Sequence, residues 1–217
     1  MLLCLNNILV TPEHWMLILK GLGATVVITV LALALGTLLG AGIYAMGLSR
    51  KRWVRETSKV YRIVMRGTPV LILLLVVFYV VLGSRCGILA AVLAFALNFS
   101  TLAYALIQSS FESVGRAQFE AGRALGLTPM QNLRYVVLPQ ALHNALPAFK
   151  FQASGLAKST SVVGYVAIQD ITKAAEAIRE GTGQSLIPLL IVTAIYFALT
   201  WAINKGLDRI VKNIDRL

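Results

Sequence analysis

The feature that most constrains this chain is a run of 27 residues, 22–48, that contains no charged side chain. A helix of about 20 apolar residues is long enough to cross the hydrocarbon core of a bilayer. Only 13% of the 217 residues are charged, whereas soluble domains average about 25%. A single water-soluble core cannot hide this much apolar surface, so we expect the bilayer to be the chain's solvent.

Four further segments are predicted to cross the membrane, which makes the fold class all-α with about five transmembrane helices. They are residues 70–82, 86–111, 148–168 and 186–203. The first of these is only thirteen residues long. Its helix must therefore begin upstream, near Arg66 and Gly67, with the Arg66 side chain extending to the membrane interface.

The basic residues predict the orientation of these spans, because Lys and Arg collect in cytoplasmic loops. Fifteen lie on one predicted side: Arg50, Lys51, Arg52, Arg55, Lys59, Arg62, Arg66, Arg116, Arg123, Arg134, Lys150, Lys205, Arg209, Lys212 and Arg216. Three lie on the other: Arg85, Lys173 and Arg179. We therefore predict an external N-terminus and a cytoplasmic C-terminus. The net charge of +11 interrupts apolar runs and forms no basic stripe with aromatics, which argues against nucleic-acid binding.

A polar stretch, residues 113–147, separates the third and fourth predicted spans. Its first part, residues 112–125, is compatible with a helix that ends at Gly126. Glycine is suited to the position after a helix because it adopts positive φ without strain. This stretch is too long for a simple connection and predicts two short helices.

The second short helix has a clear start signal. Thr128 is placed as the N-cap, Pro129 as the first helical residue and Gln131 as the partner in a capping box. The pair Leu138-Pro139 is expected to end or kink it. Such a helix–turn–helix unit is a stiff projection that can insert into a partner's groove.

The spacing of residues within this stretch is distinctive. Glu120-Ala121 is followed after four residues by Gly126, and after nine more by Val136-x-Leu138-Pro139. This pattern resembles the EAA loop of type I ABC importer permeases, with Val136 in place of Ile. The residue after Ala121 is a further departure, since Gly122 replaces the third letter of the family motif.

Segments elsewhere are similar to the polar amino acid branch of that family, whose substrates include His, Glu, Gln, Arg and opines. They are Gly21-x-x-x-Thr25, the segment Tyr61 to Pro69 that resembles Tyr-x-x-x-Phe-Arg-Gly-Thr-Pro, and Lys158-Ser-Thr-Ser161. The resemblance covers about residues 20–208. It implies one ABC type-1 transmembrane domain over residues 1–217, with the EAA loop at 113–147 between helices 3 and 4.

The resemblance also implies a function and partners. The chain would be a multi-pass permease subunit of the bacterial cytoplasmic membrane that moves amino acids by alternating access. It would pair with a second permease subunit, a dimer of cytoplasmic ABC ATPase subunits that bind ATP and Mg²⁺, an external substrate-binding protein and membrane lipid. Glu120, Ala121, Leu125 and Gly126 would couple the loop to the ATPase. No catalytic residue, metal ligand or cofactor site is assigned to this chain.

Polar residues inside the predicted spans are candidates for the substrate pathway, because they are costly in a membrane and tend to face a cavity. They are Asn98, Thr101, Gln108, Lys158, Ser159 and Thr160. The first three follow one helix face, and the Lys158 ammonium could meet a substrate carboxylate. The alternatives are snorkelling of Lys158 and hydrogen bonds between helices.

The third span departs from the amino acid permease pattern. Ala105 and Gln108 stand where that pattern has Glu and Arg. Two charged side chains that could bind a zwitterionic substrate are therefore absent. Either the substrate differs or a second, non-identical permease supplies the binding residues. The rival function is an ATP-independent channel or carrier for small polar solutes. An ATPase in this chain is not predicted, since Ala157 replaces the glycine that a phosphate-binding loop requires.

The segment 169–184 lies on the predicted outer side and has the pattern of an amphipathic helix that ends near Gly181 and Gly183. We expect it to form the outer rim of the protein, near a gate or where a binding protein docks. A solvated surface helix is the alternative.

Overall fold

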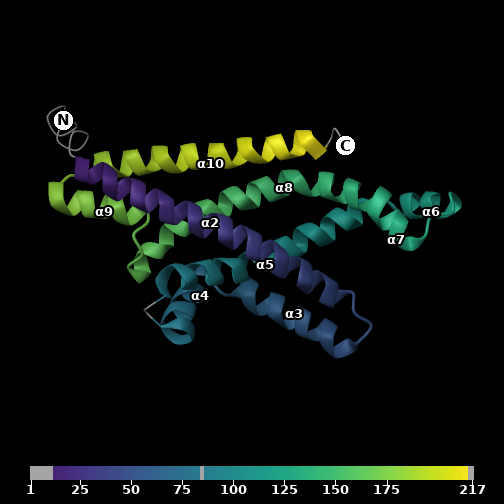
Figure 1. The fold of residues 1–217 in the computed structure, drawn as a ribbon. Coiled ribbons are helices and arrows are strands. Elements are labelled where there is room, and N and C mark those ends of the chain that lie inside the picture. Colours follow the sequence, from purple (N-terminus) through teal and green to yellow (C-terminus); the bar gives the residue numbers. More distant parts are fainter. Residues whose placement is uncertain (1–11, 84–85, 215–217) are drawn as a thin grey trace.

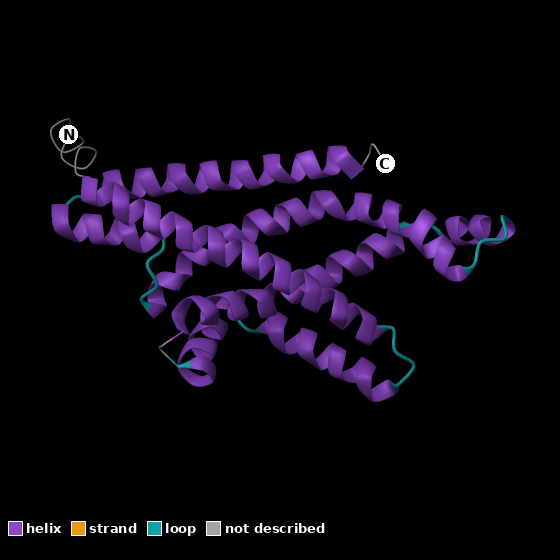
Figure 2. Ribbon diagram, in the orientation of Figure 1, coloured by secondary structure: helices purple, strands orange, loops and turns teal. Residues whose placement is uncertain are grey.

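The computed structural model describes residues 12–83 and 86–214, with side chains as far as Arg209. All regular elements in this part of the chain are helical (Figure 2). They are α2 (Pro12–Gly47), α3 (Arg52–Gly67), α4 (Val70–Val76), the π-helix η1 (Val77–Leu82), α5 (Gly87–Ser113), α6 (Arg116–Ala124), α7 (Pro129–Asn132), the π-helix η3 (Leu133–Val137), α8 (Leu138–Ser159), the 3₁₀ helix η4 (Thr160–Val166), α9 (Ile171–Thr182) and α10 (Leu186–Ile214).

The long helix α2 packs along α5 at the centre of the molecule (Figure 1). Gly36 and Gly40, spaced four apart on α2, make this contact close. A Cβ on Gly40 would lie 2.6 Å from the Cβ of Ala103, and one on Gly36 would lie 2.9 Å from the carbonyl oxygen of Ala96. Small residues spaced four apart on one helix face let two membrane helices approach this closely.

The second predicted span differs from expectation. No helix continues through Gly67 into the apolar run, because α3 ends at Gly67 and α4 begins at Val70, with a bend of 106° between them. Pro69 restricts Thr68 to an extended conformation and ends the helix. The Arg66 side chain is exposed, and its Nη2 donates to the Thr101 carbonyl oxygen at 3.3 Å; its place at the membrane interface stays a prediction.

Three described helices are long and apolar enough to span a membrane: residues Pro12–Gly47, Gly87–Ser113 and Leu186–Arg209. The bent pair of α3 with α4–η1 would make a fourth. The segment 148–168, predicted as one span, is divided between the end of α8 and η4. The all-helical membrane fold is thus present, while the number of five spans stays a prediction.

The ends of the helices sort into two groups (Figure 1). The start of α2 and the helix α9 lie at one end of the molecule. The connection from α2 to α3, the short helices α6 and α7, and the end of α10 lie at the other end. We call these the α9 end and the loop end. The segments rich in Lys and Arg gather at the loop end, as the predicted topology requires.

The main core lies where α2, α4, α5 and α8 meet. Ile28, Leu74, Phe95 and Phe99 are fully buried there. In contrast, α10 is covered on only a narrow face: 17% of its apolar window is buried, and Phe197 is 73% exposed. Such a helix suits contact with lipid or with another membrane helix.

Candidate functional site

The first candidate site is the loop of residues 115–137, which we call the two-helix loop. It projects beyond the bundle at the loop end (Figure 1). Gly126 ends α6 with φ of 77°, in the left-handed region. The Leu127 N–H donates to the Gly122 carbonyl at 3.0 Å and the Gly126 N–H to that of Arg123 at 2.9 Å. These two bonds form a Schellman motif, so the predicted glycine stop is confirmed.

The predicted capping box is also confirmed. The Gln131 N–H donates to Thr128 Oγ1 at 3.3 Å, and the Thr128 N–H donates to Gln131 Oε1 at 2.9 Å. Of the two outcomes predicted at Leu138-Pro139, an end or a kink, the end does not occur, because α8 runs from Leu138 with Pro139 in its first turn. The π-helix η3 precedes it, and this wider turn accommodates the proline ring so that α8 continues. The loop is therefore joined rigidly to α8.

Gly122 explains how the two helices of this loop fit together. A Cβ on Gly122 would lie 2.4 Å from Asn132 Oδ1, so the Asn132 side chain occupies the space that an alanine would fill. Asn132 Nδ2 donates to the Phe119 carbonyl at 2.9 Å and fastens α7 to α6. The departure from the family motif at this position is thus matched by a buried asparagine.

The proposed coupling residues all lie on the outer surface of the two-helix loop. Glu120, Ala121 and Gly126 are exposed, and Leu125 is 80% exposed. Met130, at 70%, adds a second large apolar side chain to the same projection. The arrangement is a stiff hairpin with apolar side chains directed away from the protein's own core.

The second candidate site is the polar face of α5. Asn98 and Gln108 are half-buried, whereas Thr101 is 1% exposed. The Thr101 hydroxyl donates to the Asn98 carbonyl at 3.0 Å, and Gln108 Nε2 donates to Glu112 Oε1 at 2.8 Å. These partners of Thr101 and Gln108 both lie within α5.

The polar residues of α8 and η4 are less uniform. Lys158 is exposed, Ser159 is half-buried and Thr160 is buried. The hydroxyls of Ser159 and Thr160 donate to carbonyls of α8, at 3.0 Å and 2.8 Å. Among the residues that the structure describes, no hydrogen bond joins this group to the polar face of α5.

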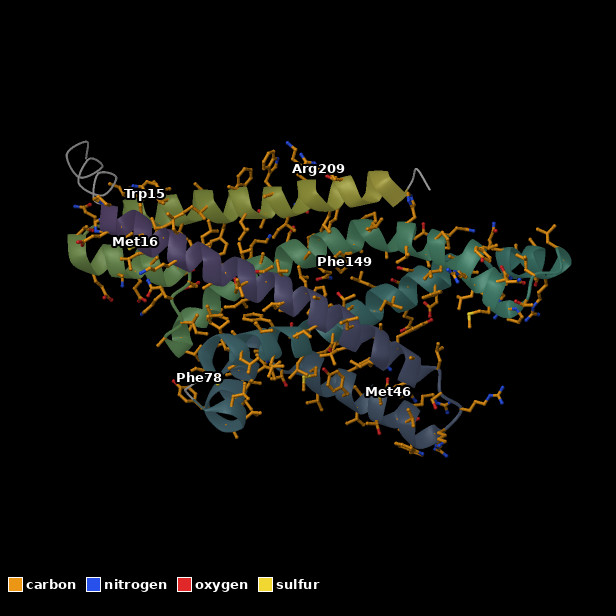
Figure 3. All side chains as sticks on the ribbon, in the orientation of Figure 1. Trp15, Met16, Met46, Phe78, Phe149 and Arg209 are labelled. Atoms are coloured by element: carbon orange, nitrogen blue, oxygen red, sulfur yellow. The ribbon has the colours of Figure 1, made fainter. Side chains whose placement is uncertain are left out.

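Aromatic packing connects the two helices that carry these groups. Phe99 of α5 meets Phe149 of α8 edge to face, with 6.1 Å between ring centroids, in the middle of the bundle (Figure 3). The two polar groups therefore flank a closed apolar contact. The structure places both sets on packed neighbouring helices but does not bring them into one pocket.

Most of the chain matches known proteins of the same architecture. Residues 32–217 match the family described as the binding-protein-dependent transport system inner membrane component. The chain belongs to this family.

Individual relatives agree with the family. The chain is 28% identical over 212 residues to the L-cystine transport system permease protein TcyB of Bacillus subtilis (strain 168), covering 96% of this chain and 91% of TcyB. It is 29% identical to the arginine transport system permease protein ArtQ of the same organism, covering 91% and 94%.

Solved structures show the same fold. The match to the structure described as an amino acid ABC transporter with histidines has a TM-score of 0.83 and 31% identity, and covers 93% of this chain and 95% of that one. The inward-facing MetNI methionine ABC transporter matches with a TM-score of 0.78 at 20% identity. The predicted class, a permease subunit of an ABC importer, is confirmed, and these findings do not support the ATP-independent alternative.

The permease structure also reveals contacts that the sequence did not assign to a site. Tyr61 and Ser100 share a hydrogen bond of 2.9 Å between α3 and α5, and the Arg62 guanidinium lies 4.0 Å from the Tyr104 ring centroid. The segment Tyr61 to Pro69 had signalled the family, but only packing shows which of its side chains face α5.

A second group ties α8 of the permease to α10. Lys150 pairs with Asp208, and Ser154 Oγ donates to Asn204 Oδ1 at 3.1 Å. On each helix the two residues are four apart, so the two contacts lie one helical turn from each other. Long-range pairs of this kind have no local sequence signal.

At the α9 end the permease has a pocket of about 400 Å³ between η4, α9 and the start of α10. Lys173, Glu176 and Arg179 line it. Lys173 Nζ lies 2.6 Å from Glu176 Oε2, and this hydrogen bond and charge raise the pKa of Lys173 and lower the pKa of Glu176. The predicted amphipathic helix is confirmed here, with Gly183 at its end.

Asp170 is the buried carboxylate of this end. It is fully buried and caps α9 by accepting a hydrogen bond from the Lys173 N–H at 2.8 Å. Gly21 of α2 makes room for it, since a Cβ there would lie 2.4 Å from the Asp170 carbonyl oxygen. This contact explains why a side chain at Gly21 of this chain would not fit.

Proposed function

We propose that this permease subunit imports an amino acid and is driven by a separate cytoplasmic ATPase. The relatives support the substrate class: TcyB is an L-cystine transport system permease and ArtQ an arginine transport system permease. The solved transporter with 31% identity is described as an amino acid transporter. We place the chain in the bacterial cytoplasmic membrane as one domain, residues 1–217, with its core at about 20–208.

The observation that carries the ATPase assignment is the exposed apolar tip of the two-helix loop. Leu125 and Met130 are 80% and 70% exposed on a rigid projection outside the bundle. Large apolar side chains grouped on a polar surface mark contacts with a partner. We propose that Leu125 and Ala121 enter a groove of the ATPase and that Glu120 contacts the polar rim of this groove. Gly126 would maintain the conformation of the turn between α6 and α7. ATP and Mg²⁺ would be bound by that partner.

We further propose a topology of five spans with an external N-terminus and a cytoplasmic C-terminus. The bent pair of α3 with α4–η1 and the α8–η4 segment would supply the second and fourth spans. This places the EAA loop, residues 113–147, between helices 3 and 4 on the cytoplasmic side. The gathering of basic segments at the loop end supports it.

The pathway would run beside α5 and α8. We assign Asn98, Thr101 and Gln108 to one wall and Lys158, Ser159 and Thr160 to the other, with Lys158 as the cation exposed to substrate. A second permease subunit, identical or homologous, would complete the pathway, and an external binding protein would deliver the amino acid. Alternating access then requires helices that move when the ATPase pulls on the loop.

The experiment is purification of the tagged permease from its native membrane in mild detergent, with partners identified by mass. Leu125→Asp should remove the ATPase subunit from the purified complex, because a carboxylate replaces the apolar contact. Leu48→Asp is the matched control, since Leu48 is 69% exposed on the connection from α2 to α3. Recovery of the ATPase with Leu125→Asp but not with Leu48→Asp would reject the assignment, as would a wild-type chain that purifies alone.

A further inference from the structure

The pocket at the α9 end has the size and the chemistry of a site for a small polar ligand. Its volume of about 400 Å³ lies within the range of about 300–1,000 Å³ that is usual for ligand pockets. Helix α9 and the start of α10 lie at the end of the molecule opposite the two-helix loop (Figure 1). The polar part of the wall includes Ser161, Tyr165, Lys173, Glu176, Arg179 and Ser185.

The three charged side chains of the pocket form one cluster on α9. Glu176 Oε2 lies 2.6 Å from Lys173 Nζ, and Glu176 Oε1 lies 3.7 Å from Arg179 Nη2. Two cations thus share one carboxylate, and the cluster has one positive charge in excess. The three side chains are 40–47% exposed, so a ligand in the pocket can reach all of them.

This cluster can exchange partners with a ligand. A separation of 3.7 Å between Arg179 and Glu176 is too long for a hydrogen bond. A ligand carboxylate can therefore approach the guanidinium without breaking a hydrogen bond of this pair, and it would form stronger, charge-assisted bonds. The Glu176 carboxylate accepts more than one hydrogen bond, so it can receive a ligand ammonium while it stays beside Lys173.

The pocket offers charges that the candidate pathway on α5 lacks. From Gly87 to Phe111 this helix contains no charged residue, so its polar face presents only neutral groups to a substrate. The two regions are connected through the chain, because Ser161 lines the pocket and directly follows Thr160 of the proposed pathway wall. A ligand held in the pocket would lie at the outer entrance of that pathway.

We propose that this pocket is an entry site that binds the zwitterionic backbone of an amino acid. Glu176 would accept the α-ammonium group, and Lys173 and Arg179 would bind the α-carboxylate. This inference rests on the proposed function and adds a site at which the amino acid arrives before it enters the pathway. Contacts between exposed charges contribute only about 0–1 kcal/mol each. Binding is therefore weak and quickly reversed, as transfer into the pathway requires.

The test measures protection of a cysteine in the pocket. Ser185 is exposed and lines the pocket. The Ser185→Cys permease, with both native cysteines replaced by serine, is purified in mild detergent with its partners. It is then labelled with a methanethiosulfonate reagent, which does not react with amines. The ligands are L-alanine, N-acetyl-L-alanine and L-alaninamide, and the last two each lack one backbone charge.

L-Alanine at about 10 mM should slow the labelling about two- to tenfold, as a dissociation constant of about 1–10 mM implies. Each of the two analogues should slow it less, because one of its backbone groups cannot pair with the cluster. Glu180→Cys is the matched control, since Glu180 is exposed on α9 and does not line the pocket. Its labelling rate should be the same with all three ligands.

Variants of the charged residues connect protection to the proposed contacts. Glu176→Gln should make L-alanine no better than N-acetyl-L-alanine, because the ammonium group loses its acceptor. Lys173→Gln combined with Arg179→Gln should make L-alanine no better than L-alaninamide. Glu180→Gln removes a carboxylate one helical turn from Glu176 and should leave the order of the three ligands unchanged. Each comparison is made between ligands on one variant, so a general loss of stability cannot produce the expected pattern.

Two results would overturn the inference. One is equal protection by L-alanine and both analogues in the permease with its charged cluster intact, and the other is no protection by any of them. Amino acid import is tested independently, by comparing uptake of labelled amino acids into cells with and without the permease. Uptake that depends on the permease, without protection of Ser185→Cys, would reject the entry site and leave the proposed function standing.

Discussion

At the scale of single residues, the two-helix loop depends on a side chain that its motif does not contain. Asn132 is 3% exposed and lies directly over Gly122, with its amide bonded to the Phe119 carbonyl. Its Oδ1 has no hydrogen-bond partner among the described atoms. The pair Gly122–Asn132 is therefore a fitted unit, in which one residue supplies the space and the other the bond.

Gly122→Ala should destabilise the two-helix loop by about 1–3 kcal/mol, the usual cost of adding a methyl to a filled site. Adding Asn132→Ala should restore part of this loss, because the smaller side chain vacates the space. Thermal unfolding and recovery of the ATPase subunit measure the two effects. A double variant that is less stable than Gly122→Ala alone would show that the clash is not the cause.

Asp170 provides a pH-dependent prediction. Burial raises its pKa above the ordinary value, and hydrogen bonds from Lys173, Thr172 and Tyr196 oppose that shift only in part. The folded protein thus holds this proton more tightly than the unfolded chain. The stability that protonated Asp170 contributes is greatest at low pH and is lost as pH rises through the raised folded-state pKa.

Asp170→Asn should therefore unfold at a higher temperature than the wild type at pH 7.5, and the difference should shrink as the pH falls toward 4. Asn retains the N-cap, whereas Asp170→Ala should lose about 0.5–2 kcal/mol with the cap. Thermal unfolding across this pH range is the measurement. A difference that stays constant with pH would mean that the charge of Asp170 does not matter.

At the scale of elements, the seam between α2 and α5 determines how closely the central helices approach. Gly40 faces α5, whereas Gly42 on the same helix has no atom within 4 Å of a built Cβ. Gly40→Ala should cost about 1–3 kcal/mol through overpacking. Gly42→Ala should be neutral or slightly stabilising, because alanine favours helix over glycine by about 1 kcal/mol. Equal unfolding temperatures for the two variants would contradict the close contact of Gly40 with α5.

At the scale of the whole molecule, the α9 end and the loop end should face opposite sides of the membrane. With both cysteines replaced by serine, Glu180→Cys on α9 should react with a membrane-impermeant maleimide in intact spheroplasts. Arg123→Cys on the two-helix loop should react only after the membrane is permeabilised. The reverse pattern of labelling would invert the proposed topology.

The sequence by itself determined the membrane class, the family and the local shape of the loop. Long charge-free runs require a bilayer because no soluble core can hide them. The glycine stop at Gly126 and the capping box at Thr128 and Gln131 were predictable since each depends on residues no more than five apart. Local chemistry is sufficient for such features.

Only the tertiary structure decided which residues face one another. The burial of Asp170 against Gly21 and the cations of α3 beside α5 depend on contacts between distant segments. In a helix every position is locally similar, so periodicity shows that a face exists but not which neighbour covers it. That choice is made by the packing of α2, α3 and α5, where the space left by one side chain is filled by another.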